Sequence, residues 1–248
     1  MKSNNRIDQA IRYKPIIDYI NRNKPKKILE IWSWSQWIWR FINISFDWLD
    51  LSKADYSTEE KNSPKNMHFI YWSALNMPID DNVYDFVFSC DMLEHINKDN
   101  RESALNEAIR VCKKWWTVIF WFPCWFWWKL CDYSLFYLIK IRYLISKDGD
   151  VPSRLTEHIK IDYPTDREIK YLIKKVLDKH QMSIKEIQEY NSNNVFFHFI
   201  SIVINISRLQ YYSRIQKLNN TIIDKYLSKK SSIKSIFPYR KYIIIQKI

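Results

Sequence analysis

The chain contains a single glycine, Gly149, and this scarcity limits what it can fold into more than any other feature. Glycine adopts left-handed backbone conformations without a steric penalty, so tight turns and close main-chain approaches usually depend on it. A globular chain of 248 residues would carry roughly 17 glycines at the usual frequency of about 7%. A compact α/β fold therefore needs another source for its turns, and the twelve tryptophans indicate where those turns lie.

All twelve tryptophans lie between Trp32 and Trp128, and they cluster where turns are expected rather than on one apolar face. The apolar segment 27–31, a predicted buried strand, leads directly into Trp32-Ser-Trp-Ser-Gln-Trp-Ile-Trp39. With glycine in place of each tryptophan, this stretch becomes a glycine-rich loop between a strand and a helix. The same replacement predicts glycines typical of a nucleotide-binding α/β fold at three more places: Trp48, Trp72 and the pair Trp115-Trp116.

We hypothesise that the gene specifies glycine at these positions. The codon UGA means stop in the standard genetic code, tryptophan in some variant codes and glycine in others. A UGA-glycine gene translated with a tryptophan table would lose glycines and gain tryptophans at turns, as seen here. The alternative is a chain with genuine tryptophans whose aromatic run, residues 115–128, lies in a membrane interface.

Short apolar segments alternate with helical patterns in the first half of the chain. This rhythm indicates right-handed βαβ crossovers and a parallel sheet with helices on both faces. Strands are predicted at 27–31, 45–50, 67–71, 84–89 and 117–122. Helices are predicted at 5–22 with an interruption near Pro15, from Gln36 to about Ile44, and at 98–112.

The second half is less regular. Thr165 and Glu168 form a capping box that predicts a helix reaching about Lys179. Further helices are predicted at 130–146 and 195–227, and strands at 182–190 and 241–246. Because no internal repeat or low-complexity linker is found, the sequence indicates one domain, residues 1–248, with a helical insertion before the last strand.

Composition excludes several classes of protein. No apolar run reaches the roughly 18 residues of a membrane-spanning helix, and the polar start, Met1 to Arg6, resembles no secretory signal. The spacings of the four cysteines match no zinc or redox motif, which favours a reduced, cytoplasmic setting and no metal site.

Positive charge is concentrated at the C-terminal end. Residues 195–248 contain ten Lys or Arg and one acid, Asp224, whereas the whole chain has a net charge of +12. The simpler interpretation is a solvated basic face. The sharper one is a patch for an anionic partner, such as a membrane surface, a polyanionic substrate or RNA.

With the glycines restored, the stretch from Glu30 to Trp39 resembles the first motif of class I S-adenosylmethionine-dependent methyltransferases. The likeness extends over about residues 25–125 and is strongest for the small-molecule branch called type 11. It continues through Asp50, Tyr71–Pro78, Tyr84–Ile96 and Lys113–Ile119. The resemblance implies a doubly wound, mostly parallel, seven-stranded Rossmann-like sheet whose last strand is antiparallel.

The resemblance also implies where S-adenosylmethionine binds. Glu30 would orient the amino-acid end of the cofactor through the first turn, Asp50 would accept both ribose hydroxyls, and the Ser73 segment would contact adenine. The family often has an acid where Ser73 stands. The implied cofactor-binding residues are Glu30, Trp32, Ser33, Trp34, Asp50, Leu51, Ser73, Ala74, Leu75, Cys90 and Asp91.

Each of these residues also has a simpler structural interpretation. Glu30 could be a surface carboxylate at a strand end, and Asp50 a helix cap. The Glu94-His95 pair could serve packing, and a lone loop histidine such as His158 is more often structural than catalytic. The weak candidates for a catalytic base are His95, His158 and Asp91.

The expected reaction is methyl transfer to an O, N or C nucleophile on a small-molecule or lipid- or glycan-linked acceptor. Segments 124–165 and 195–235 would cover the acceptor, and residues 195–248 could reach an anionic membrane surface. We therefore expect a cytoplasmic protein, with peripheral contact to the membrane through that basic region.

Three alternatives stay open. An RNA methyltransferase would use the basic C-terminal region, although no base-methylation motif or RNA-binding module is found, so nucleic acid is not favoured. The second is an NAD(P)-binding oxidoreductase: with glycine at Trp32, Trp34 and Trp37, the segment would match the GxGxxG fingerprint of such enzymes. The third is the non-catalytic membrane-surface protein with genuine tryptophans.

Overall fold

The computed structural model describes residues 7–31, 38, 41–42, 44–51, 67–123, 130, 133–134, 136–137, 140, 162–180, 184–194, 221 and 238–247. Several predicted features therefore lie outside the described residues. They are most of the helix from Gln36 to Ile44, most of the helical stretch 130–146, all but residue 221 of the insertion 195–235, the tryptophans of the first motif, Ser33 and His158.

Seven strands form one sheet in the order β3-β2-β1-β4-β5-β7-β6. The first five strands pair in parallel, and β7 runs antiparallel to both β5 and β6. This confirms the predicted, mostly parallel, seven-stranded sheet with an antiparallel last strand. The strands are β1 (Ile28–Ile31), β2 (Phe46–Asp50), β3 (Met67–Tyr71), β4 (Tyr84–Cys90), β5 (Cys112–Pro123), β6 (Ile184–Asn194) and β7 (Pro238–Lys247).

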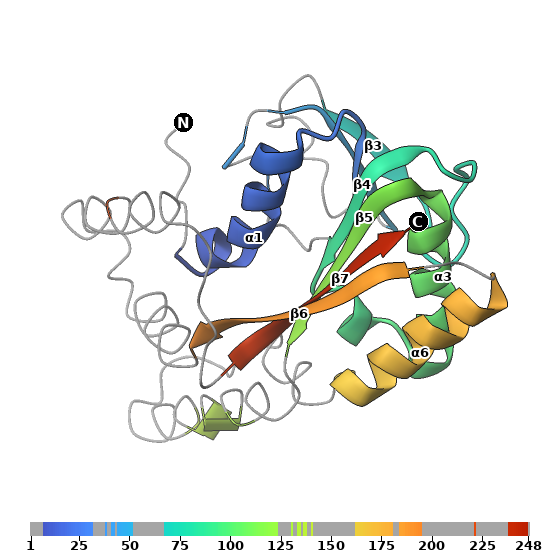
Figure 1. The fold of residues 1–248 in the computed structure, drawn as a ribbon. Coiled ribbons are helices and arrows are strands. Elements are labelled where there is room, and N and C mark those ends of the chain that lie inside the picture. The colour runs from blue at the N-terminus through green and yellow to red at the C-terminus, as the bar shows by residue number, and fades with distance from the viewer. Residues whose placement is uncertain are drawn as a thin grey trace.

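Helices cover both faces of the sheet, as Figure 1 shows. Helix α1 (Ile7–Asn23) packs on one face, whereas α3 (Arg101–Val111) and α6 (Asp166–Lys179) pack on the other. Two 3-10 turns, η3 (Leu93–His95) and η4 (Lys98–Asn100), connect β4 to α3. Among the described helices, none is both long and apolar enough to cross a membrane.

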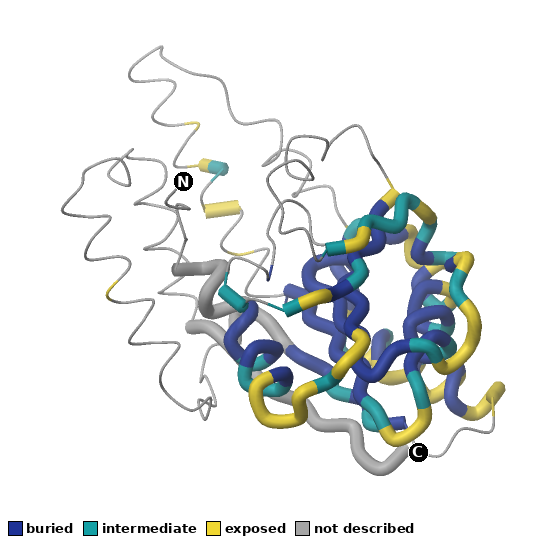
Figure 2. The backbone as a smooth tube through the Cα atoms, turned by 90° about the horizontal axis from the view of Figure 1, so that it is seen from above, coloured by how far each residue is buried: buried dark blue, intermediate teal, exposed yellow. Residues whose placement is uncertain are grey.

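Two buried cores result from the alternation of side chains along the central strands. Val87 of β4 and Phe120 of β5 face α3 and α6, whereas Phe86 and Ile119 face α1. All four side chains are fully buried, and burial of such a side chain contributes roughly 1.5–3 kcal/mol. Figure 2 shows the buried backbone, in dark blue, in the interior of the described part of the protein, with exposed segments around it.

The predicted interruption of the first helix is wrong, because α1 continues through Pro15 from Ile7 to Asn23. A proline in a helix removes one backbone donor and crowds the preceding turn. Here Tyr13, Ile16 and Ile20 flank the proline and are buried against the sheet. We attribute the unbroken helix to this packing on both sides of Pro15.

Two of the tryptophans lie within strands and not at turns, in agreement with the predicted strands 45–50 and 117–122. Trp48 lies in the middle of β2 and Trp121 lies in β5, and both indoles are buried in the α1-facing core. Trp48 packs edge-on against Phe69 at 5.2 Å, and Trp121 stacks with Tyr242 at 5.6 Å between ring centroids. Both positions are therefore strand interiors with side chains that point inward.

Trp115 does lie at an irregular point of the backbone. Its φ is 68°, in the left-handed region that favours glycine, and its side chain is 68% exposed. Strand β5 begins at Cys112, earlier than predicted, but its pairing jumps from Cys112 to Thr117 while β4 advances only from Tyr84 to Phe86. The predicted turn before Thr117 is thus a bulge within β5.

The predicted helix start is confirmed, with the Thr165 half of the capping box in place. Thr165 precedes α6, and its Oγ1 accepts the backbone N–H of Glu168 at 3.2 Å. One of the four unpaired N–H groups at the helix start is thereby satisfied, which typically contributes about 1 kcal/mol.

Candidate functional site

A pocket of about 240 Å³ lies where β2 and β3 end and the chain after β4 turns back toward α3. In a parallel α/β sheet, ligands bind at this carboxyl edge of the strands. The pocket brings together three segments that are distant in sequence. Its lining residues are Leu49, Asp50, Leu51, Trp72, Ser73, Ala74, Leu75, His95, Ile96, Asn97 and Asn100.

Asp50 supplies the buried carboxylate of the pocket. Asp50 is the last residue of β2, and the residue is only 3% exposed. The backbone N–H of Trp72 donates to the Asp50 carbonyl at 2.9 Å, which keeps the end of β3 beside the end of β2. A carboxylate held at such an edge can accept two neighbouring hydroxyl groups of a ligand.

The turn after β3 forms one apolar wall. The Ser73 hydroxyl accepts the backbone N–H of Leu75 at 3.2 Å, and the Ser73 carbonyl accepts the N–H of Asn76 at 3.4 Å. These bonds fix the turn that carries Ala74 and Leu75 along the pocket. At the rim, the Trp72 side chain is 50% exposed, so a glycine there would widen the opening.

The opposite wall comes from the chain between β4 and α3. His95, Ile96, Asn97 and Asn100 line the pocket there. The structure thus places His95, a candidate base, in the same pocket as Asp50. Sequence reasoning did not single out the other three, because their proximity to Asp50 depends on how β4 lies relative to β2.

Cys90 is the last residue of β4 and Asp91 follows it, but neither lines the pocket. The Cys90 side chain is fully buried in the α1-facing core. Asp91 is 9% exposed and has a φ of 54°, and its N–H donates to the Trp121 carbonyl at 2.9 Å. Aspartate tolerates this left-handed conformation better than most residues, and such conformations are concentrated at functional sites.

Glu30 lies in β1 with no exposed surface, which excludes a surface carboxylate. Its backbone is opposite Trp48 and Phe88 in the sheet, both of which face α1. The hydroxyl of Tyr13 in α1 donates to Glu30 Oε1 at 2.9 Å. Sequence reasoning missed Tyr13, although its spacing from Ile16 and Ile20 places it on the buried stripe of the helix.

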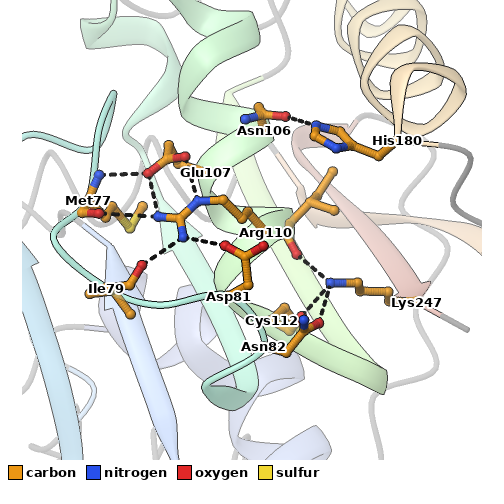
Figure 3. A network of polar contacts seen from close by, with 11 residues as sticks. Met77, Ile79, Asp81, Asn82, Asn106, Glu107, Arg110, Cys112, His180 and Lys247 are labelled. Carbon is orange, nitrogen blue, oxygen red and sulfur yellow. Dashed lines mark hydrogen bonds and ion pairs between the residues drawn. The ribbon is translucent and has the colours of Figure 1, made fainter.

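A charged network anchors the loop that follows the pocket-lining turn (Figure 3). Arg110 of α3 forms a two-point ion pair with Glu107 at 2.8 Å, and its guanidinium also donates to Ile79 O and to Asp81, both at 2.7 Å. Glu107 in turn accepts the N–H of Met77 at 2.6 Å. Burial alone would raise the pKa of Glu107, but the hydrogen bonds from Arg110 and Met77 outweigh it and hold that pKa below its usual value.

The last strand is tied to the same loop. Lys247 at the end of β7 is 3% exposed, and its Nζ donates to Asn82 Oδ1 at 2.8 Å and to Cys112 O at 2.7 Å. Burial lowers the pKa of this lysine. The loop between β3 and β4 is therefore held from both α3 and β7, which fixes the base from which the Ser73 turn extends.

Other predicted site residues cannot be placed. Trp32, Ser33, Trp34 and His158 lie outside the described residues. Within the described part of the chain, no group of three His, Cys, Asp or Glu side chains is close enough to hold a metal ion.

Comparison with known proteins identifies a related domain. Residues 36–119 match the family model described as a methyltransferase domain, which is about a third of the chain. No curated protein sequence matches. Solved structures resemble the chain over nearly its whole length, although at low sequence identity.

Three methyltransferases illustrate the similarity. The plantazolicin methyltransferase BamL, in complex with a triazolic desmethylPZN analogue and SAH, has a TM-score of 0.57 at 16% identity, covering 97% of this chain and 85% of BamL. Phosphoethanolamine N-methyltransferase 2 from Haemonchus contortus, in complex with S-adenosyl-L-methionine, has a TM-score of 0.54 at 14% identity, with coverages of 95% and 52%.

A SAM-dependent methyltransferase from Methanosarcina mazei has a TM-score of 0.50 at 16% identity, covering 94% of this chain and 96% of that protein. Together with the sheet order, these likenesses show that the chain has the Rossmann-like fold of class I methyltransferases.

Proposed function

We propose that the protein is an S-adenosylmethionine-dependent methyltransferase. The observation that carries the proposal is the buried Asp50 carboxylate at the end of β2, which lines a pocket whose other walls are the Ser73 turn and the His95 loop. The methyltransferase-domain match over residues 36–119 supports the same conclusion, and so does the fold. We assign S-adenosylmethionine as the cofactor and the whole chain, with its core at 25–125, as one domain.

The pocket suits the nucleoside half of that cofactor. Asp50 would accept the two ribose hydroxyls, and the apolar wall made by Leu51, Ala74 and Leu75 would contact the adenine ring. His95 then belongs to the cofactor side and is a poor candidate for a base that acts on the acceptor. Because Ser73 Oγ already accepts the Leu75 N–H, its second lone pair is the one available to adenine.

We assign Glu30, Cys90 and Asp91 to the methionyl half. Glu30 would orient the amino-acid end of the cofactor through the first turn. The hydrogen bond from the Tyr13 hydroxyl would hold the Glu30 carboxylate in place. Asp91, which lies outside the described pocket, would border the methionyl half through its backbone, whose direction is set by its left-handed φ of 54°. Ser33, with glycines at the positions of Trp32 and Trp34, would complete this half through the main chain of the turn.

When bound, S-adenosylmethionine supplies a methyl group on an already reactive sulfonium. The chain then has to align the acceptor, exclude water and, for a weak nucleophile, remove a proton. We propose a small-molecule or lipid- or glycan-linked acceptor, covered by segments 124–165 and 195–235. Residues 195–248, with ten Lys or Arg and one acid, would bring the protein to an anionic membrane surface from the cytoplasm. RNA, the other partner class suited to this charge, is not favoured.

We also propose that the natural chain carries glycine at the twelve tryptophan positions. Trp115 supports this, because its φ of 68° is unfavourable for a residue with a side chain and ordinary for glycine. The buried Trp48 and Trp121 give no such support, since a tryptophan fills each of those sites. Peptide mass spectrometry of the native protein decides the matter: glycine masses are expected, and tryptophan masses would refute the proposal.

A thermal shift measurement tests the cofactor assignment. A ligand at one hundred times its Kd stabilises the native state by about 2.7 kcal/mol, so S-adenosylhomocysteine should raise the melting temperature clearly. NAD⁺ and NADP⁺ serve as matched controls, because they also carry an adenosine. A shift with NAD⁺ and none with S-adenosylhomocysteine would replace the methyltransferase by the oxidoreductase alternative.

A further inference from the structure

One buried arginine connects the pocket wall to a helix on the outer layer of the protein. Arg101 is the first residue of α3 and is only 1% exposed. A buried guanidinium is strongly unfavourable unless its donors are paired. Arg101 satisfies this requirement with partners on two sides, one belonging to the pocket and the other to the approach to α6.

On the pocket side, the guanidinium holds both ends of the turn that carries His95. Its Nε donates to the Leu93 carbonyl at 3.0 Å and to the Ile96 carbonyl at 3.2 Å. His95 and Ile96 line the pocket next to Asp50. The path of this wall therefore depends on where the Arg101 side chain is held.

On the other side, the same group holds the start of α6. Nη1 pairs with Glu168 Oε1 at 2.7 Å, and Nη2 donates to the Asp162 carbonyl. Glu168 is the third residue of the helix, and its backbone N–H is capped by Thr165. Asp162 lies near the end of segment 124–165, which the proposed function places over the acceptor, so Arg101 holds this end of the segment.

We propose that Arg101 is a positioning residue that couples the cofactor-pocket wall to α6 and to the end of the acceptor-side segment. The planar fork of the guanidinium allows one side chain to contact three carbonyls and a carboxylate in fixed directions, which a lysine cannot do. A movement at Asp162 or Glu168 is thereby transmitted to the backbone at Leu93 and Ile96. The identification of the cofactor and acceptor rests on the proposed function, whereas the coupling between the pocket wall and α6 through Arg101 does not.

A second ion pair between the same helices provides the control. Lys175 of α6 pairs with Glu102 of α3 at 2.6 Å, one residue away from Arg101. Neither Lys175 nor Glu102 lines the pocket. Loss of this pair removes a contact between α3 and α6 and leaves the Arg101 bonds in place.

The experiment compares Glu168→Gln with Lys175→Met by two readouts. The first is hydrogen exchange of the backbone amides of residues 93–97, measured without ligand. The second is the Kd of S-adenosylhomocysteine. Glu168→Gln should speed exchange in 93–97 by about fivefold and raise the Kd by a similar factor, whereas Lys175→Met should leave both within about twofold. Equal behaviour of the two variants in the exchange readout would overturn the proposal.

Arg101→Lys adds a test of the fork geometry. It keeps the charge but cannot hold all four acceptors, so we expect exchange in 93–97 to be at least as fast as in Glu168→Gln. Wild-type exchange in Arg101→Lys would also overturn the proposal. If the wild-type protein does not bind S-adenosylhomocysteine at all, the proposed function fails, and the exchange measurements still decide whether Arg101 couples the two elements.

Discussion

The Tyr13 hydroxyl of α1 donates a hydrogen bond of 2.9 Å to Oε1 of Glu30 in β1, and neither residue has exposed surface. Removal of a donor from a buried charged or polar partner typically reduces stability by about 1–3 kcal/mol. We therefore expect Tyr13→Phe to lower the free energy of unfolding by an amount in this range, measured by urea denaturation. Tyr171→Phe, on the exposed face of α6, is the control and should have almost no effect. Equal effects would show that the bond to Glu30 is energetically unimportant.

Asp50→Ala should remove most of the affinity for S-adenosylmethionine. Hydrogen bonds to a charged group contribute about 1.5–3 kcal/mol, which corresponds to a loss of at least tenfold in Kd. Asp178→Asn, an exposed carboxylate on α6, should bind the cofactor like the wild type. The measurement is a fluorescence or calorimetric titration. Unchanged affinity in Asp50→Ala would remove Asp50 from the cofactor site.

Trp115→Gly should stabilise the chain that carries tryptophan at this position. The left-handed backbone conformation is unfavourable by roughly 1–2 kcal/mol for a residue with a Cβ atom, and glycine relieves it. The neighbouring Trp116 is half-buried and packs against the core that faces α3 and α6, so Trp116→Gly should destabilise. Opposite signs of the two shifts in melting temperature are expected. Destabilisation by Trp115→Gly would show that the left-handed backbone at residue 115 does not favour glycine.

Acid should weaken the Arg110 network through Glu107. Because the pKa of Glu107 in the folded protein lies below its usual value of 4.5, its contribution to stability is complete above that value and is lost as the pH falls through the lower, folded-state pKa. Urea midpoints measured from pH 6 down to pH 3 should therefore fall less steeply for Glu107→Gln than for the wild type. Parallel curves would mean that Glu107 has the same pKa in the folded and unfolded states.

The five parallel strands of the sheet could be predicted because each contains a short, largely apolar run bounded by polar or turn-forming residues. The pattern at Tyr84–Cys90 is apolar on both faces, as in a buried parallel strand, and the structure buries every residue of it. The bulge at Trp115 could be predicted only as a turn. The sequence does not show that β5 pairs with β4 both before the bulge, at Cys112, and after it, from Thr117 onward. The continuity of α1 through Pro15 depends on tertiary packing, which local propensity does not contain.

The pocket was predicted in part, for a similar reason. Asp50, Leu51 and Ser73 follow strand ends, so their gathering at one edge follows from the parallel sheet and from the resemblance to methyltransferases. Asn97 and Asn100 carry no recognisable motif, and Arg101 reads as an ordinary surface residue at a helix start. The role of Arg101 depends on its contact with Glu168, 67 positions away, which spacing alone cannot indicate.

The most direct test of the account is calorimetric titration of S-adenosylmethionine into the chain made with glycine at the twelve tryptophan positions. The account predicts saturable binding of one cofactor per chain, abolished or strongly weakened by Asp50→Ala. It also predicts weaker binding by the chain that carries the twelve tryptophans, because the indoles at the end of β1 would occupy the space around the first turn. Absence of binding by the folded glycine form would contradict the methyltransferase assignment.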